Sequence, residues 1–178
     1  MTDAAALGAH GELIAPMTVR IERLLPGPID RIWSYLTDSE LRGKWLATGD
    51  MPDQPGAKVE LVWRNDDLSG RNEQRPEGVP AERRMACEVI RAEVPRLLVL
   101  GWGASGSEVT FELSPQGAEV LLTVTHRRLP DRDNLMGVSA GWHAHLDMLV
   151  GVLRGGELPL FWANWARLRG EYDQRLPQ

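Results

Sequence analysis

A long amphipathic pattern over residues 137–153, near the C-terminal end, constrains the fold more than any other feature of the sequence. Its apolar residues recur at spacings of three and four, which places them along one side of a helix. A helix with one broad apolar stripe is expected to pack that stripe against a larger surface. The stripe consists of Val138, Trp142, His145, Leu146, Leu149, Val152 and Leu153, whereas Ser139, His143, Asp147 and Arg154 lie off it.

The rest of the chain supplies alternating strand patterns that would form this surface. Apolar and polar residues alternate with a period of two, as in half-buried strands. Short connections between the later strands favour an antiparallel meander. Strands are predicted over residues 17–25, 57–64, 83–93, 96–102, 107–114 and 118–129, two short helices over 28–36 and 39–46, and a terminal helix over 160–176. The inward residues of the last four strands are predicted to be Met85, Cys87, Val89, Leu98, Leu100, Trp102, Val109, Phe111, Leu113, Val120, Leu122, Val124 and His126.

Two segments stand apart from these patterns. Residues 1–16 are small, polar and aperiodic, so we expect a flexible N-terminal tail before a single domain over residues 17–178. Residues 65–81 are polar, rich in Gly and Pro, and longer than most connections. Because this segment has almost no apolar residues to offset its ordering entropy, it is predicted to be a mobile flap or a decorated hairpin.

Composition excludes several classes of function. A formal charge of −5 argues against a nucleic-acid groove or an anionic membrane surface, both of which favour dense Lys and Arg. The single cysteine excludes an intrachain disulfide and fits a reducing compartment. The N-terminal stretch has no Lys or Arg and no long apolar block, unlike a signal peptide, and no run approaches the length of a transmembrane helix. We therefore expect a cytoplasmic protein with no membrane insertion and no nucleic-acid partner.

Two glycine motifs match known sites in letters but not in context. The segment GWGASG at residues 101–106 matches the dinucleotide fingerprint, yet a strand pattern follows it where a helix is required. The segment GVSAG at residues 137–141 matches the nucleophile elbow of serine hydrolases, yet a polar loop precedes it and no histidine follows Asp147. The sequence therefore predicts no cofactor and no serine nucleophile.

The histidines are the remaining candidates for chemistry. His143 and His145 point away from each other on a helix, so they cannot chelate one metal ion, and no metal site is predicted. His143 and Asp147, one turn apart, are predicted to pair at the surface. His145 on the apolar stripe and the inward His126 each have three open interpretations: a hydrogen-bonded core residue, a polar anchor in a cavity, or a catalytic base. No predicted inward face carries two carboxylates, and this argues against the interpretation of the chain as an acid–base enzyme.

Five segments, taken in order, are similar to a known family: WSYLTDSELRGKWL, VPRLLVLGWG, SEVTFELSP, LLTVTHRRLP and AGWHAHLDMLVGVL. They resemble the SRPBCC or START-like superfamily, and within it the bacterial homologues of the activator of heat-shock-protein-90 ATPase. The resemblance runs from about Met17 to Leu176 and implies an α+β helix-grip fold, in which an antiparallel sheet curves around a long C-terminal helix and leaves an apolar cavity. The cavity wall that it implies consists of Trp45, Trp63, Leu100, Trp102, Phe111, Leu122, His126, Trp142, His145 and Leu149. No catalytic residue is implied, because the superfamily's catalytic sites differ between branches.

Three functions follow as hypotheses. The first is non-enzymatic binding of a small apolar or aromatic molecule, for which tryptophan-rich inward faces with few polar groups are typical. The second is a cyclase- or dehydratase-like enzyme with His126 or His145 as general base. The third is a chaperone-interaction module whose sheet or terminal helix docks on a partner. A homodimer stays open in all three, and family membership alone decides none of them.

Overall fold

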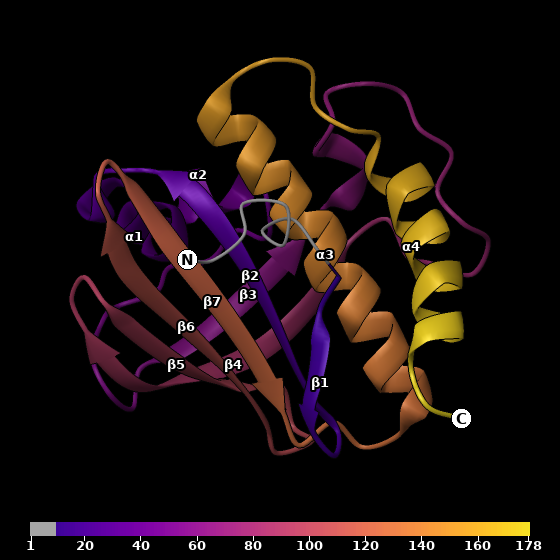
Figure 1. The fold of residues 1–178 in the computed structure, drawn as a ribbon, viewed down its shortest axis with the longest axis horizontal. Helices are drawn as coiled ribbons and strands as arrows, with labels where there is room; N and C mark the ends of the chain where they lie inside the picture. Colours follow the sequence, from indigo (N-terminus) through magenta and orange to yellow (C-terminus); the bar gives the residue numbers. More distant parts are fainter. Residues whose placement is uncertain (1–9) are drawn as a thin grey trace.

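The computed structural model describes residues 10–178 and shows an antiparallel sheet that curves along one side of a long helix (Figure 1). The strands follow the order β1-β2-β7-β6-β5-β4-β3. This arrangement confirms the predicted α+β helix-grip fold. The strands are β1 (Glu12–Ala15), β2 (Thr18–Pro26), β3 (Lys58–Trp63), β4 (Arg83–Glu93), β5 (Leu97–Trp102), β6 (Ser107–Gln116) and β7 (Glu119–Arg127). The helices are α1 (Ile29–Thr37), α2 (Ser39–Gly43), the short 3-10 helix η1 (Asn65–Asp67), α3 (Arg132–Arg154) and α4 (Phe161–Arg175).

The sheet buries one face, as the alternation of its residues predicts. In β7 the four predicted inward residues, including Leu122 and His126, are at most 2% exposed. The predicted inward residues of β5 and β6 are buried in the same way, apart from Trp102, which is partly exposed. Strand period therefore identified the concave face of the sheet correctly, because successive side chains of a strand point to opposite faces.

Helix α3 lies between the sheet and α4 (Figure 1). It begins earlier than predicted because the Asp131 side chain caps it, accepting a hydrogen bond of 2.8 Å from the Asn134 backbone N–H. Since α4 covers the side of α3 that the sheet leaves free, residues off the predicted stripe are also buried; Ser139 is 1% and His143 5% exposed. No helix within residues 10–178 is long and apolar enough to cross a membrane.

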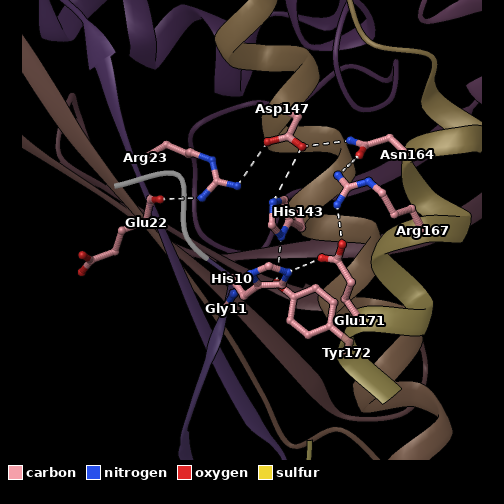
Figure 2. A network of polar contacts seen from close by, with 10 residues as sticks. All are labelled: His10, Gly11, Glu22, Arg23, His143, Asp147, Asn164, Arg167, Glu171 and Tyr172. Atoms are coloured by element: carbon pink, nitrogen blue, oxygen red, sulfur yellow. Dashed lines mark hydrogen bonds and ion pairs between the residues drawn. The ribbon is translucent and has the colours of Figure 1, made fainter. Parts of the chain in front are cut away.

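The predicted surface pair of His143 and Asp147 is instead part of a half-buried network between β2, α3 and α4 (Figure 2). His143 Nε2 lies 3.7 Å from Asp147 Oδ2, and its Nδ1 lies 3.0 Å from the Tyr172 hydroxyl. Asp147 also accepts a hydrogen bond of 3.3 Å from the inward-facing Arg23. The surface placement was wrong because α4 covers this face of α3, and burial lowers the pKa of His143 to about 4.

The N-terminal segment is held against α4 at residues 10 and 11, where the sequence predicted a flexible tail. The Gly11 backbone N–H donates to the Tyr172 hydroxyl at 2.6 Å, and His10 Nε2 lies 2.5 Å from a Glu171 carboxylate oxygen (Figure 2). Residues 12–15 form β1, which pairs with β2. The predicted tail over residues 1–16 is therefore wrong from residue 10 to residue 15, and residues 1–9 lie outside the described part of the chain.

A buried arginine organises the connection between α1 and β3. Arg42 is 2% exposed and donates hydrogen bonds to four backbone carbonyls instead of a carboxylate. Three of these bonds, to Leu36, Thr37 and Ala47, measure 3.1 Å, and the fourth is to Gly49. Burial lowers the pKa of Arg42 to about 10. The guanidinium thus satisfies carbonyls that no secondary structure pairs.

Polar contacts anchor residues 65–81 to the start of α4. The Glu73 carboxylate accepts hydrogen bonds from the backbone N–H groups of Phe161 at 3.0 Å and Trp162 at 2.9 Å. The Trp162 indole N–H donates to Asp66 at 2.8 Å. The sequence predicted a mobile flap or a decorated hairpin here, and the segment does connect the antiparallel pair β3 and β4. Its charged groups bind N–H groups that are unpaired at the beginning of a helix.

Candidate functional site

A cavity of about 520 Å³ lies between α3, α4 and one end of the sheet. Trp63, Trp102 and His126 border it from the last or next-to-last residue of β3, β5 and β7. The N-terminal half of α3 forms a second wall, and the beginning of α4 forms a third. Its volume is in the range of ordinary small-molecule pockets.

Tryptophans form most of the cavity wall. Five of the seven tryptophans in the chain border it: Trp63, Trp102, Trp142, Trp162 and Trp165. The ring centroids of Trp63 and Trp102 lie 5.8 Å apart, and those of Trp102 and Trp142 lie 5.3 Å apart. These separations are typical of aromatic pairs that pack edge-to-face or tilted. The wall therefore presents broad aromatic surfaces to any molecule inside.

Two glycines of α3 keep the cavity open. Gly137 and Gly141 are one turn apart and both border the cavity. A Cβ atom added to either glycine would have no neighbour within 4 Å beyond the adjacent helix backbone. Each glycine in a helix interior costs about 0.5 to 1 kcal/mol relative to alanine. At these two positions glycine makes the helix less stable than alanine would, and it leaves space in the cavity that a side chain would occupy.

His126 borders the cavity and carries a buried hydrogen-bond donor that has no partner among the described residues. The Trp142 indole N–H donates to His126 Nδ1 at 3.1 Å, so Nδ1 is the unprotonated nitrogen of the neutral ring. Nε2 therefore carries the proton, and this buried atom has no partner among the described residues. Burial lowers the pKa of His126 to about 4, which keeps the ring neutral at physiological pH. An unpaired buried donor is rare in folded proteins and suggests a missing partner.

His145 has the opposite arrangement of protons. Its Nδ1 lies 2.8 Å from the backbone carbonyl oxygen of Trp45, and because a carbonyl only accepts, Nδ1 must carry the proton. Nε2 is then an acceptor, and it has no hydrogen-bond partner in the described part of the chain. Burial lowers the pKa of His145 to about 4, although the bond to Trp45 opposes this shift. The Phe161 ring packs against His145 with centroids 4.7 Å apart.

Charged side chains gather at the rim. The Arg83 guanidinium lies 5.6 Å from the centre of the Trp63 ring, and that of Arg169 lies 5.4 Å from the centre of Trp165. Neither arginine has a carboxylate partner among residues 10–178. Asp133 is the acidic residue that also borders the cavity. The rim is thus polar and the interior aromatic.

The structure brings together five of the ten predicted wall residues: Trp63, Trp102, His126, Trp142 and His145. The other five lie deeper in the core and do not border the cavity, namely Trp45, Leu100, Phe111, Leu122 and Leu149, each at most 2% exposed. Sequence period shows which face a residue occupies, but it does not show the depth at which a gap opens along that face.

Sequence reasoning missed the contribution of α4. Phe161, Trp162 and Trp165 border the cavity, although the sequence assigned this segment only to a terminal helix. The pair Trp162 and Trp165, three residues apart on a helix, was the available signal, because such residues share a face. Within residues 10–178, no group of three or more His, Cys, Asp or Glu side chains has the arrangement to hold a metal ion.

Comparison with known proteins identifies the family. The family described as activator of Hsp90 ATPase homolog 1-like protein matches residues 26–154. The chain belongs to this family. The resemblance found in the sequence is thereby confirmed. No curated protein matches the chain significantly.

Solved structures of this architecture include relatives at two levels of similarity. The solution NMR structure of a Bordetella parapertussis protein is 39% identical, with 100% of this chain and 97% of that chain covered and a TM-score of 0.76. CalU16 from Micromonospora echinospora is 23% identical over 93% of this chain and 94% of its own, with a TM-score of 0.66. DynU16, a putative protein in the dynemicin biosynthetic locus, is 20% identical over 80% of this chain and 49% of its own, with a TM-score of 0.63. The last two likenesses concern the fold alone.

Proposed function

We propose that this protein binds a small aromatic molecule, non-covalently and without converting it, in the cavity between α3, α4 and the sheet. The observation that carries this proposal is the concentration of five tryptophans around one cavity that two helix glycines leave open. Concave, mostly apolar pockets with a few placed polar groups are typical of ligand sites. The ligand-binding residues are then Trp63, Trp102, His126, Trp142 and His145, together with the aromatic residues of α4. A cytoplasmic location is part of this proposal, and the single cysteine of the sequence supports it because it fits a reducing compartment.

Elementary energetics sets the affinity to be expected. A ligand that buries about 300 Å² of apolar surface gains about 7 kcal/mol, from which association costs remove a substantial part. Contacts with aromatic ring faces offset some of this cost. Micromolar affinity is therefore expected for a molecule of two fused rings.

The enzyme alternative has weaker support than binding. An efficient general base has a pKa near the working pH, whereas burial lowers the pKa of both His126 and His145 to about 4. Among residues 10–178, no carboxylate is a hydrogen-bond partner of either ring. The chaperone alternative rests on the family's description alone, and no feature of the cavity favours it over binding a small molecule.

The test combines ligand detection with a cavity-filling variant. Native mass spectrometry of the freshly purified protein is expected to show a retained small molecule, and titration with naphthalene is expected to quench tryptophan fluorescence with micromolar affinity. Gly141→Leu places a side chain in the cavity and is expected to abolish this binding while the protein stays folded. Gly170→Leu makes the same change on α4 away from the cavity and serves as the control. Equal binding by wild type and Gly141→Leu would overturn the proposal.

A further inference from the structure

Two arginines at the border of the cavity lie over tryptophan rings that also border it. The guanidinium of Arg83, the first residue of β4, lies 5.6 Å from the centre of the Trp63 ring. The guanidinium of Arg169, on α4, lies 5.4 Å from the centre of the Trp165 ring. A guanidinium over an aromatic ring makes this contact through its face, whereas its N–H groups lie in its plane. The tryptophans therefore position both cations without using their hydrogen-bond donors.

Neither guanidinium forms an ion pair within the described part of the chain, although their neighbours in sequence do. Arg84, the residue after Arg83, contacts two carboxylates at 2.7 Å. Arg167, two residues before Arg169, contacts one at 2.5 Å. The unpaired cations are thus the ones that border the cavity. A cation held on an aromatic ring with its N–H groups unused is suited to bind an anion from outside the protein.

The charge at the border of the cavity is opposite in sign to that of the whole chain. The charged residues there are Arg83, Arg169 and Asp133, so positive charge exceeds negative charge by one, whereas the chain has a formal charge of −5. Asp133 lies in the first turn of α3, where the positive end of the helix dipole offsets part of its charge. A local positive excess of this kind attracts anions.

We propose that the ligand of this cavity is an aromatic carboxylate, whose ring packs on the tryptophans and whose anionic group pairs with the guanidinium of Arg83 or Arg169 at the rim. This inference rests on the proposed function, since it names the ligand class of the same cavity. The two oxygens of a carboxylate match the N–H groups of one guanidinium, so contact with either arginine is sufficient. A single negative charge on the ligand also balances the local excess of one positive charge.

Three probes of nearly equal shape and different charge test this preference. At pH 7, 2-naphthoate is an anion, 2-naphthamide is neutral and 2-naphthylmethylamine is a cation. Because both arginines are exposed, we expect 2-naphthoate to bind about threefold to tenfold more tightly than 2-naphthamide, and the cation to bind most weakly. Raising the salt concentration from about 0.1 M to about 1 M shortens the Debye length from about 10 Å to about 3 Å and is expected to reduce this preference. Calorimetric titration of the full chain measures the dissociation constants.

Charge-removing variants connect the preference to the two arginines. The double variant Arg83→Gln with Arg169→Gln is expected to lose the preference for 2-naphthoate, and at least one of the single variants is expected to lose part of it. Asp133→Asn is expected to strengthen binding of 2-naphthoate. Arg31→Gln is the matched control, because this guanidinium lies 5.9 Å from the centre of the Tyr35 ring and does not border the cavity. Thermal denaturation verifies that each variant is folded.

The outcomes separate this inference from the proposed function. Binding of 2-naphthamide as tightly as 2-naphthoate to the wild type would overturn the carboxylate assignment and leave the proposed function standing. An unchanged preference in the double variant, or an equal loss in Arg31→Gln, would also overturn it. Tightest binding of the cation would do the same, because Asp133 would then set the charge preference. Failure of naphthalene and of all three probes to bind would refute the proposed function and this inference together.

Discussion

Lowering the pH from 7 to 5 is expected to destabilise the protein strongly, because two cavity histidines are buried in the neutral form. Burial lowers the pKa of His126 and of His145 to about 4, and the same side chain in an unfolded chain has a pKa of about 6.5. Between these two values the unfolded state binds a proton at each site that the folded state does not bind. Stability is therefore complete above about pH 6.5 and is lost as the pH falls toward 4.

The magnitude follows from the two pKa values. Each histidine lowers the free energy of unfolding by about 2 kcal/mol between pH 7 and pH 5, so the pair lowers it by about 4 kcal/mol. A domain of this kind has a total stability of about 5 to 15 kcal/mol. His143, whose pKa burial also lowers to about 4, acts in the same direction. A large part of the fold's stability is thus expected to disappear over two pH units.

Urea denaturation at a series of pH values from 7.5 to 5 measures this loss. His126→Asn and His145→Asn each remove one of the titrating groups, so each is expected to reduce the difference between pH 7 and pH 5 by about 2 kcal/mol. The comparison uses that difference within each variant, which cancels the effect of the substitution at neutral pH. An equal free energy of unfolding of the wild type at pH 7 and pH 5 would refute the reasoning, because it would mean that these rings are protonated in the folded state.

Three further predictions concern single positions. Gly141→Ala is expected to raise the melting temperature by about 2 to 4 °C, because alanine has a higher helix propensity and its Cβ meets no neighbour. Gly151→Ala is not expected to raise it, because the new Cβ would lie 2.7 Å from the Leu158 side chain. Equal shifts of the two variants in a thermal melt would contradict this prediction. Arg42→Met is expected to lower the free energy of unfolding by about 3 to 5 kcal/mol in urea denaturation, since two buried and two partly buried carbonyls lose their donor. A change below 1 kcal/mol would refute this prediction. Glu73→Gln is expected to speed hydrogen exchange of the first α4 amides by weakening their cap, and unchanged exchange would show that the cap adds no protection.

Local sequence patterns were enough to predict the helices and strands and to identify the residues on the concave face of the sheet. The alternation in β7 placed His126 inward, and the three-and-four spacing in α3 placed Trp142 and His145 on a buried side of the helix. These predictions succeeded because strand and helix periods depend on backbone geometry alone. The residues of the cavity wall were predicted only in part, because the cavity opens where Gly137 and Gly141 lack side chains and α4 stands beside them.

Errors arose where a second element covers a face that looks exposed in the sequence. His143 was predicted at the surface because it lies off the apolar stripe, but α4 buries it. The N-terminal segment was predicted to be flexible because it is polar, but the Gly11 backbone binds Tyr172, 161 residues away. Contacts of this kind depend on which elements meet in space, and no pattern within either segment encodes them.

By itself, the sequence determined the α+β class, the strands that surround one long helix, and the aromatic character of their inner faces, because these follow from residue period and composition. Only the tertiary structure decided that Nε2 is a donor in His126 and an acceptor in His145. The tautomer of an imidazole is set by the partner of its other nitrogen, and those partners, the Trp142 indole and the Trp45 carbonyl, come from elements that meet only in the folded chain.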